Sequence, residues 1–190
     1  AYEIAYRTGG RAGFVVNADR EFMKRNLMNV LGEDCDHSRI IKEHNRMRAL
    51  ESLDPYFLKF IPEPYRISDF MEFRNLEALK RAHQKGRGVV LFGGHYGRAS
   101  LPLVGLGHMN FRVGCITVEI QENPNLGPSE RSYLQMKSDE VERHAGGVFA
   151  RRGKVGDLKQ LFRLLKEKGL VTVLLDVVNS ENGGVKLPFL

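Results

Sequence analysis

Hydrophobic residues follow two different periods along the chain. Apolar positions recur at helical spacing over residues 11–31, 38–60, 75–85, 97–107 and 155–168, and on a segment that runs toward Arg143. Short runs rich in apolar residues predict strands at 89–92, 111–118 and 171–175, with further candidates at 66–73 and 147–150. Because strands and helices alternate from residue 66 on, the pattern predicts an α/β fold with a mixed, mostly parallel sheet flanked by helices.

The ends and faces of these helices are also predicted. Gly32 should stop the first helix, Ser38 should cap the second, and Gly169 should end the last. The second helix should bury Ile41, Met47, Leu50 and Leu53, although Pro55 interrupts its pattern. The last helix should bury Leu158, Leu161, Phe162 and Leu165 on one face, and the strand at 89–92 should be buried throughout.

Length and composition predict one domain over residues 1–190. The chain stops at Pro188-Phe189-Leu190, so we expect it to be truncated at the C-terminus. It begins without Met, which leaves truncation at the N-terminus as a second expectation. Two cysteines cannot form a disulfide framework or a four-cysteine zinc site, which favours a reducing compartment. No apolar run reaches the roughly 18 to 20 residues that span a bilayer.

The net charge of +6 favours an anionic partner, such as a membrane surface, a phosphorylated substrate, an acidic carrier protein or a nucleic acid. Lys and Arg outnumber Asp and Glu between residues 151 and 168, which is equally typical of a solvated helix face. No helix-turn-helix, zinc-finger, RRM or KH signature is present, so we expect no nucleic acid partner.

The segment most suggestive of chemistry follows the strand at 89–92. It reads Gly93-Gly94-His95-Tyr96-Gly97-Arg98-Ala99-Ser100. Ligands of open α/β sheets collect beyond the carboxyl ends of strands, and paired glycines let a substrate approach the backbone closely. A histidine at this position is suited to acid–base chemistry, whereas the alternative is a histidine that caps the next helix or packs in the core.

A second candidate segment follows the strand at 171–175. Asp176 comes directly after the strand, and Gly183-Gly184 and Val185-Lys186-Leu187-Pro188-Phe189 come next. A carboxylate at a strand end orients another side chain or caps the following turn, and the residues leave both roles open.

Together these segments resemble a known family. The block from Gly86 to Gly97 resembles the glycine–strand–His-x-Gly block of the bacterial lipid A biosynthesis acyltransferases, the lauroyl and myristoyl transferases. The stretch from Leu175 to Phe189 is similar to that family's Asp-Gln…Gly-Gly-Val…Pro-Phe block, and Asn123-Pro124 to its Asn-Pro segment. The resemblance covers nearly the whole chain, but the part that follows the Pro-Phe block in the family is absent.

The resemblance implies a glycerol-phosphate acyltransferase-like (lysophospholipid acyltransferase-like) fold and transfer of a fatty acyl group. The donor would be an acyl carrier protein or coenzyme A thioester, and the acceptor a hydroxyl or amine of a lipid or glycolipid. No cofactor is implied beyond the acyl thioester, which is a co-substrate. The implied place is the cytoplasmic face of the bacterial inner membrane, as a peripheral protein or anchored by a segment not present here.

The same resemblance assigns roles to residues. The family carries a His-x4-Asp/Glu dyad, in which the histidine takes the proton of the acceptor and the carboxylate stabilises the imidazolium. His95 matches the histidine, but Ser100 stands at the acidic position, and no Asp or Glu lies between Tyr96 and Val118. Either Ser100 is an engineered replacement, or another carboxylate reaches in, with Asp176 and Glu119 the first candidates, or the protein is a divergent member.

Further residues are expected to bind substrate. Arg98 stands where the family usually has Asn or a similar residue, so we expect it to pair with a phosphate or to lie on the surface. Arg143 matches a family arginine that would contact the thioester oxygen or a phosphate, and Arg131 is the alternative match. The expected substrate-binding set is Gly94, Tyr96, Gly97, Arg98, Arg143, Asp176, Gly184, Pro188 and Phe189. The remaining histidines lack metal-ligand spacing, so we expect them to be structural and expect no metal.

Two functions therefore follow from the sequence. The leading one is a membrane-associated acyltransferase with His95 as general base. The alternative is a catalytically silent homologue that binds lipid or carrier protein, which Ser100 favours.

Overall fold

The computed structural model of the chain describes residues 2–9, 17–61, 70–95, 97–117, 119–151 and 156–174. The elements, in chain order, are α1 (Tyr2–Gly9), α2 (Asn17–Leu31), α3 (His37–Glu51), α4 (Asp54–Lys59), α5 (Leu76–Gln84), β1 (Val89–Gly93), α6 (Leu101–His108), β2 (Val113–Thr117), α7 (Pro128–Ala145), β3 (Gly146–Arg151), α8 (Asp157–Lys166) and β4 (Leu170–Leu174). The α/β prediction is confirmed, and all four described strands pair in parallel.

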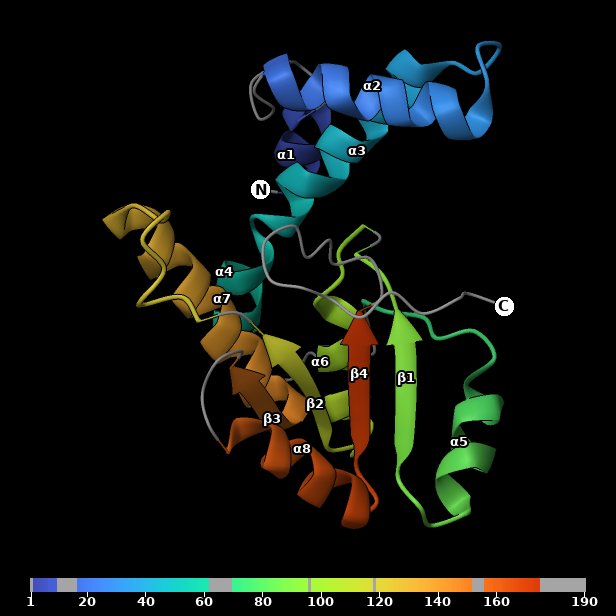
Figure 1. Cartoon of the computed structure of the whole chain (residues 1–190), viewed down its shortest axis with the longest axis vertical. Coiled ribbons are helices and arrows are strands. Elements are labelled where there is room, and N and C mark those ends of the chain that lie inside the picture. Colours follow the sequence, from blue (N-terminus) through green and yellow to red (C-terminus); the bar gives the residue numbers. More distant parts are fainter. Residues whose placement is uncertain are drawn as a thin grey trace.

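The strand order β1-β4-β2-β3 decides which face of the sheet each helix covers (Figure 1). The steps from β1 to β2 and from β2 to β3 move across the sheet in one direction, and the step from β3 to β4 moves back. Because crossovers between parallel strands are right-handed, a reversal of direction changes the face on which the helix lies. The helices α6 and α7 therefore pack together on one face, and α8 packs alone on the other.

Each face of the sheet has its own hydrophobic core. On the α6–α7 face, Val104 and Ala145 pack with Val113 and Leu170 of the two central strands, and all four are fully buried. On the α8 face, Leu161 and Leu164 pack against Ala150 of β3 and Val171 of β4. Burial on both faces explains why the strands read as continuous apolar runs.

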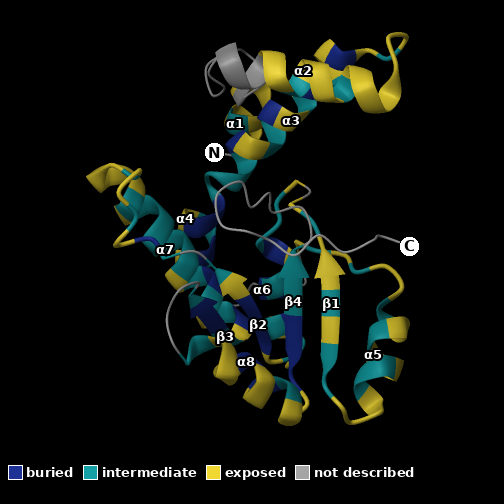
Figure 2. Cartoon of the chain, in the orientation of Figure 1, coloured by how far each residue is buried: buried dark blue, intermediate teal, exposed yellow. Residues whose placement is uncertain are grey.

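The strand β1 lies at the edge of the sheet, which corrects one prediction. Val89 and Leu91 pack against the core on the α6–α7 face, as expected for a buried strand. Val90 and Phe92 point to the other face and are 43% and 68% exposed (Figure 2), because α8 contacts β2, β3 and β4 instead. The sequence therefore identified the strand correctly but not its exposed side.

The single helix predicted over 38–60 is wrong in one respect. The structure contains two helices, α3 and α4, separated at Ser52 and Leu53. Pro55 lies in the first turn of α4, where its missing N–H costs no hydrogen bond. The cap of α3 is Asp36 and not Ser38, since the Asp36 carboxylate accepts a hydrogen bond from the backbone N–H of Arg39 at 2.9 Å.

The buried faces of two helices also differ from the predicted ones. The helix α3 buries His37, Ile41, Asn45 and Ala49, so of the predicted stripe only Ile41 is fully buried. The helix α8 buries Leu161 and Leu164, whereas Leu158 and Phe162 are 54% and 66% exposed. Hydrophobic spacing alone could not tell which part of a wide apolar stripe the sheet would cover.

Apart from the candidate strand at 66–73, the other helix and strand predictions agree closely over the described residues. The described part of that candidate, from Phe70 to Phe73, is not strand, and residues 66–69 lie outside the described part. Residues 11–16 of the first predicted helix also lie outside it, and the helix α1 was not predicted. Gly32 follows α2 at φ +79°, as predicted. At the end of α8 it is Lys168 that adopts the left-handed conformation, at φ +64°, and the next residue, Gly169, donates its N–H to the carbonyl of Leu164 at 2.8 Å.

Gly88 generates a prediction about stability. It has φ +70°, and a Cβ there would lie 2.4 Å from the carbonyl oxygen of Leu165 on α8. We expect Gly88→Ala to lower the free energy of unfolding by about 2 to 5 kcal/mol, from left-handed strain plus a backbone clash. Urea denaturation measures the change.

Gly32→Ala is the matched control, because Gly32 also has positive φ but a Cβ there meets nothing within 4 Å. It should cost only about 1 to 2 kcal/mol. Equal losses in the two variants would show that the contact with α8 contributes nothing.

Candidate active site

The parallel strands bring the predicted site to one edge of the sheet. All four strands run in the same direction, so their carboxyl ends lie together (Figure 1). His95 follows the last residue of β1 by two positions and is exposed, which confirms its predicted place at the end of this strand. The helices α1, α2 and α3 lie beyond this edge (Figure 1).

His95 lines a cavity of about 530 Å³ at this edge. The cavity is bounded by the β1–α6 loop, by α6 and α7, and by the carboxyl ends of β2 and β4. Most of its walls are apolar, formed by Ala99, Leu103, Cys115, Ile116, Ile120, Leu134, Val141, Phe149, Val173 and Leu174. An apolar cavity with a few convergent polar groups is the usual form of a small-ligand site.

The polar groups of this cavity come from several elements. His95 and Ser100 belong to the β1–α6 loop, Thr117 ends β2, and Lys137 and Ser138 lie on α7. The helix α3 adds Glu51, its last residue. Ser100 precedes α6 but makes no side-chain cap hydrogen bond to it. The structure therefore brings the candidate base and the position of the missing acid into one cavity.

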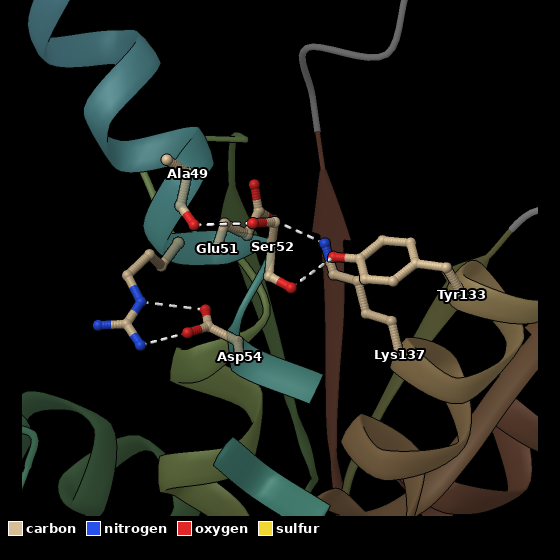
Figure 3. A network of polar contacts seen from close by, with 7 residues as sticks. Ala49, Glu51, Ser52, Asp54, Tyr133 and Lys137 are labelled. Carbon is tan, nitrogen blue, oxygen red and sulfur yellow. Dashed lines mark hydrogen bonds and ion pairs between the residues drawn. The ribbon is translucent and has the colours of Figure 1, made fainter. Parts of the chain in front are cut away.

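Glu51 and Lys137 form an ion pair on the cavity wall. The Nζ atom of Lys137 donates to Oε1 of Glu51 at 2.7 Å, and each side chain is 23% exposed (Figure 3). Among the described residues that line the cavity, Glu51 is the only carboxylate. Sequence reasoning missed both residues, because each lies on an ordinary charged helix segment and is 86 positions from its partner.

The Arg98 side chain pairs with a carboxylate of the protein itself. Its Nε atom donates to Oδ2 of Asp54 at 3.0 Å, and its Nη2 atom donates to Oδ1 of the same carboxylate. The Asp54 side chain is 2% exposed and that of Arg98 is 26% exposed. The guanidinium therefore holds a buried carboxylate of α4, and its service as a substrate ligand stays a prediction.

Neither arginine expected near the thioester lines this cavity. Arg143, in the last turn of α7, donates to Glu140 and to the backbone carbonyl of Leu58. Arg131 donates to the backbone carbonyl of Asn123 at 2.9 Å and borders a separate hollow of about 610 Å³. The predicted convergence of Arg143 with His95 is therefore wrong for this cavity; Lys137 is the cationic side chain on its wall.

Several predicted site residues lie outside the described residues. These are Tyr96, Asp176, Gly184, Pro188 and Phe189. Of the flanking glycines, Gly94 is partly buried, and Gly97 is exposed with φ +57°. The left-handed conformation at Gly97 turns the loop between His95 and α6, which a residue with a side chain does not readily allow.

The other ionisable groups near the cavity are not suited to nucleophilic chemistry. Burial raises the pKa of the Cys115 thiol to about 12, and Glu142 adds to the shift. Burial also raises the pKa of Tyr133 to about 12, and its hydroxyl donates to the carbonyl of Ser52 at 3.3 Å. A thiol that stays protonated at neutral pH is a packing group and not a nucleophile.

Four of the remaining histidines make structural contacts. Nε2 of His37 is 2.8 Å from the carbonyl oxygen of Gly32, and Nε2 of His83 is 2.8 Å from that of Lys168. His108 and His144 stack between α6 and α7, and burial lowers the pKa of His144. Within the described ranges, no three His, Cys, Asp or Glu side chains gather as a metal site would require.

None of the described helices is both long enough and apolar enough to cross a bilayer.

A known protein family matches the sequence along its whole length. The family model described as bacterial lipid A biosynthesis acyltransferase matches residues 1–190, the whole chain. None of the curated proteins matches the sequence.

The raised pKa of Cys115 generates a prediction about thiol labelling. At pH 8 a thiol of pKa about 12 is thiolate in about one molecule in ten thousand, against about one in ten for the ordinary value of 9.0. In the folded protein we expect Cys115 to react with a disulfide reagent at least about 100-fold more slowly than Cys35, which is only partly buried. Similar rates in the native state would contradict the burial of Cys115; unfolding the protein in guanidinium is the control that should equalise them.

Cys115 and Tyr133 also predict a loss of stability at alkaline pH. Their ordinary pKa values are 9.0 and 10.0, and both rise to about 12 on folding. Between pH 9 and 12 the folded protein therefore binds more protons than the unfolded chain, so the free energy of unfolding falls as the pH rises. Urea denaturation at pH 8 and pH 10.5 should differ by about 1 to 3 kcal/mol.

Cys115→Ala separates the thiol's contribution to this pH dependence. The variant loses core packing at every pH, but its stability should decline less between pH 8 and pH 10.5 than that of the unaltered protein. An equal decline would assign the pH dependence to other groups.

Proposed function

The chain belongs to the bacterial lipid A biosynthesis acyltransferase family, and from this premise we propose that it transfers a fatty acyl group with His95 as general base. The observation that supports the proposal is the place of His95, at the carboxyl end of β1 on the wall of the apolar cavity. We propose an acyl carrier protein or coenzyme A thioester as donor and a hydroxyl or amine of a lipid or glycolipid as acceptor.

In this mechanism the imidazole of His95 takes the proton from the acceptor hydroxyl. The acceptor oxygen then attacks the thioester carbonyl carbon, the carbon–sulfur bond breaks, and the thiol leaves with a proton. The apolar walls of the cavity would receive the acyl chain and keep water from the thioester. The side chains of Ser100, Thr117 and Ser138 line the same space and are available to bind the polar atoms of either substrate.

The mechanism needs a negative charge that stabilises the imidazolium, and several residues are candidates to carry it. Ser100 can accept a hydrogen bond but carries no charge. Glu51 carries a charge and lines the same cavity, so it becomes the first carboxylate to test, ahead of Glu119 and Asp176. Lys137 offsets part of that charge at 2.7 Å, which predicts a weaker effect than a dedicated dyad carboxylate would have.

The net positive charge of the chain supports the proposed partners and membrane location. A net charge of +6 attracts an acidic carrier protein and the anionic lipids of a membrane. We propose that the protein works at the cytoplasmic face of the inner membrane, with the acyl thioester as its co-substrate and no further cofactor.

A silent lipid- or carrier-binding homologue is the second candidate function. Ser100 is the observation that favours it, because a family member without a charged dyad partner loses much of its acid–base power. Such a protein would bind acyl donor or lipid in the same cavity and release no product.

Mass spectrometry of the products, after incubation with acyl thioesters and candidate acceptors, tests the proposal. His95→Ala should abolish transfer, since no other residue matches the family's base. Ser100→Glu should raise the rate by up to about 10² to 10⁴-fold by restoring a charge at the dyad position. Glu51→Gln should lower it if Glu51 is the partner in the unaltered protein.

Glu77→Gln is the matched control, because Glu77 is an exposed carboxylate on α5 whose partner is Lys80. Transfer that survives His95→Ala would overturn the role of His95. Donor binding without product in both the unaltered protein and Ser100→Glu would favour the silent homologue.

A further inference from the structure

The segment from the last residue of α3 to the first residue of α4, residues 51–54, contacts two parts of the candidate site at once (Figure 3). Toward α7, Glu51 accepts a hydrogen bond from Lys137, and the carbonyl of Ser52 accepts one from the Tyr133 hydroxyl. On its other side, Asp54 accepts two hydrogen bonds from Arg98. We call this segment the α3–α4 junction.

The ion pair between Asp54 and Arg98 is the most buried one given for the described residues. The Asp54 side chain is 2% exposed and the Arg98 side chain is 26% exposed. A buried carboxylate is costly unless its charge is met by hydrogen-bonded cations, so removing the guanidinium would leave an uncompensated charge. The arginine binds through two parallel N–H groups, which fixes orientation as well as distance.

Arg98 lies three residues after His95, on the same loop. The loop also touches α3, because a Cβ at Gly97 would lie 3.4 Å from the terminal carbon of Met47. One side of the loop is thus joined to α4 through Arg98 and another packs against α3. None of the described residues from Gly94 to Ser100 belongs to a helix or strand, and these contacts tie this part of the loop to α4 and α3.

We propose that Asp54 and Arg98 are positioning residues, whose ion pair holds the β1–α6 loop so that His95 faces the cavity. This inference rests on the proposed function, in which His95 is the base. It differs from the two alternatives that the sequence left open for Arg98, a phosphate ligand or a surface residue, because here the guanidinium acts on the protein's own loop. Neither residue is expected to touch the reacting atoms.

Two variants break the pair in different ways. Asp54→Asn keeps the size of the side chain and one acceptor oxygen but removes the negative charge. Arg98→Lys keeps the positive charge but cannot form the bidentate pair of hydrogen bonds. Hydrogen exchange followed by mass spectrometry should show amides of residues 93–100 exchanging at least about 10-fold faster in both. This measurement does not depend on activity, and Arg98→Lys serves if Asp54→Asn fails to fold.

Kinetics of the same variants separate positioning from substrate binding. A misplaced base should lower kcat by about 10 to 100-fold with little change in KM. The double variant should be no slower than the slower single variant, because both changes remove one interaction.

Two controls distinguish this effect from general destabilisation. Glu167→Gln breaks an exposed ion pair with Arg112, and Leu164→Ala opens the core beneath α8. Both should leave exchange at residues 93–100 and the kcat of the remaining folded protein close to those of the unaltered chain.

The possible results of these experiments distinguish positioning of the loop from substrate binding and from general destabilisation. Unchanged exchange at residues 93–100 in the variants, or faster exchange there in Leu164→Ala to the same degree, overturns the proposal. A higher KM in Arg98→Lys with no effect of Asp54→Asn also overturns it and makes Arg98 a substrate ligand. If the unaltered protein transfers no acyl group, the proposed function fails, while the exchange data still decide whether the pair holds the loop.

Discussion

Parallel hydrogen bonding between β1, β4 and β2 is the constraint on which the candidate site depends. Strands that run in the same direction place their carboxyl ends at one edge, and each must be joined to the next by a crossover helix. The carboxyl ends of β1, β2 and β4 therefore meet at one place, with α6 and α7 as walls. His95, Thr117 and Leu174 line one cavity although they are far apart in sequence.

The chemistry of this cavity is shaped by how few charged groups enter it. Its walls are mainly aliphatic, and the buried Cys115 keeps its proton because a thiolate would be poorly solvated there. Among the described residues that line the cavity, the charged groups are Glu51 and Lys137, which pair with each other. In a setting of low dielectric, each of these charges acts more strongly than it would in water, so the loss or gain of a single carboxylate matters.

The N-terminal helices join this site through a short stretch of chain. The α3–α4 junction contributes Glu51 to the cavity wall and Asp54 to the loop that carries His95. The interruption between α3 and α4 is what makes this geometry available, since a continuous helix would direct these side chains around one axis at 100° intervals. This break, of which the sequence showed only the interruption at Pro55, thus places Glu51 on the cavity wall and Asp54 against the loop that carries His95.

The sequence by itself determined the elements from residue 75 on and their alternation, the position of His95 after β1, and the absence of an acid at position 100. These features depend on local spacing, which is readable within ten to fifteen residues. Tertiary structure alone decided that β1 is an edge strand with Phe92 exposed, that Arg98 pairs with Asp54, and that Glu51 reaches the cavity. Arg98 and Asp54 are 44 residues apart, and the partner of a charge at that separation is set by how helices and strands pack, which no local pattern records.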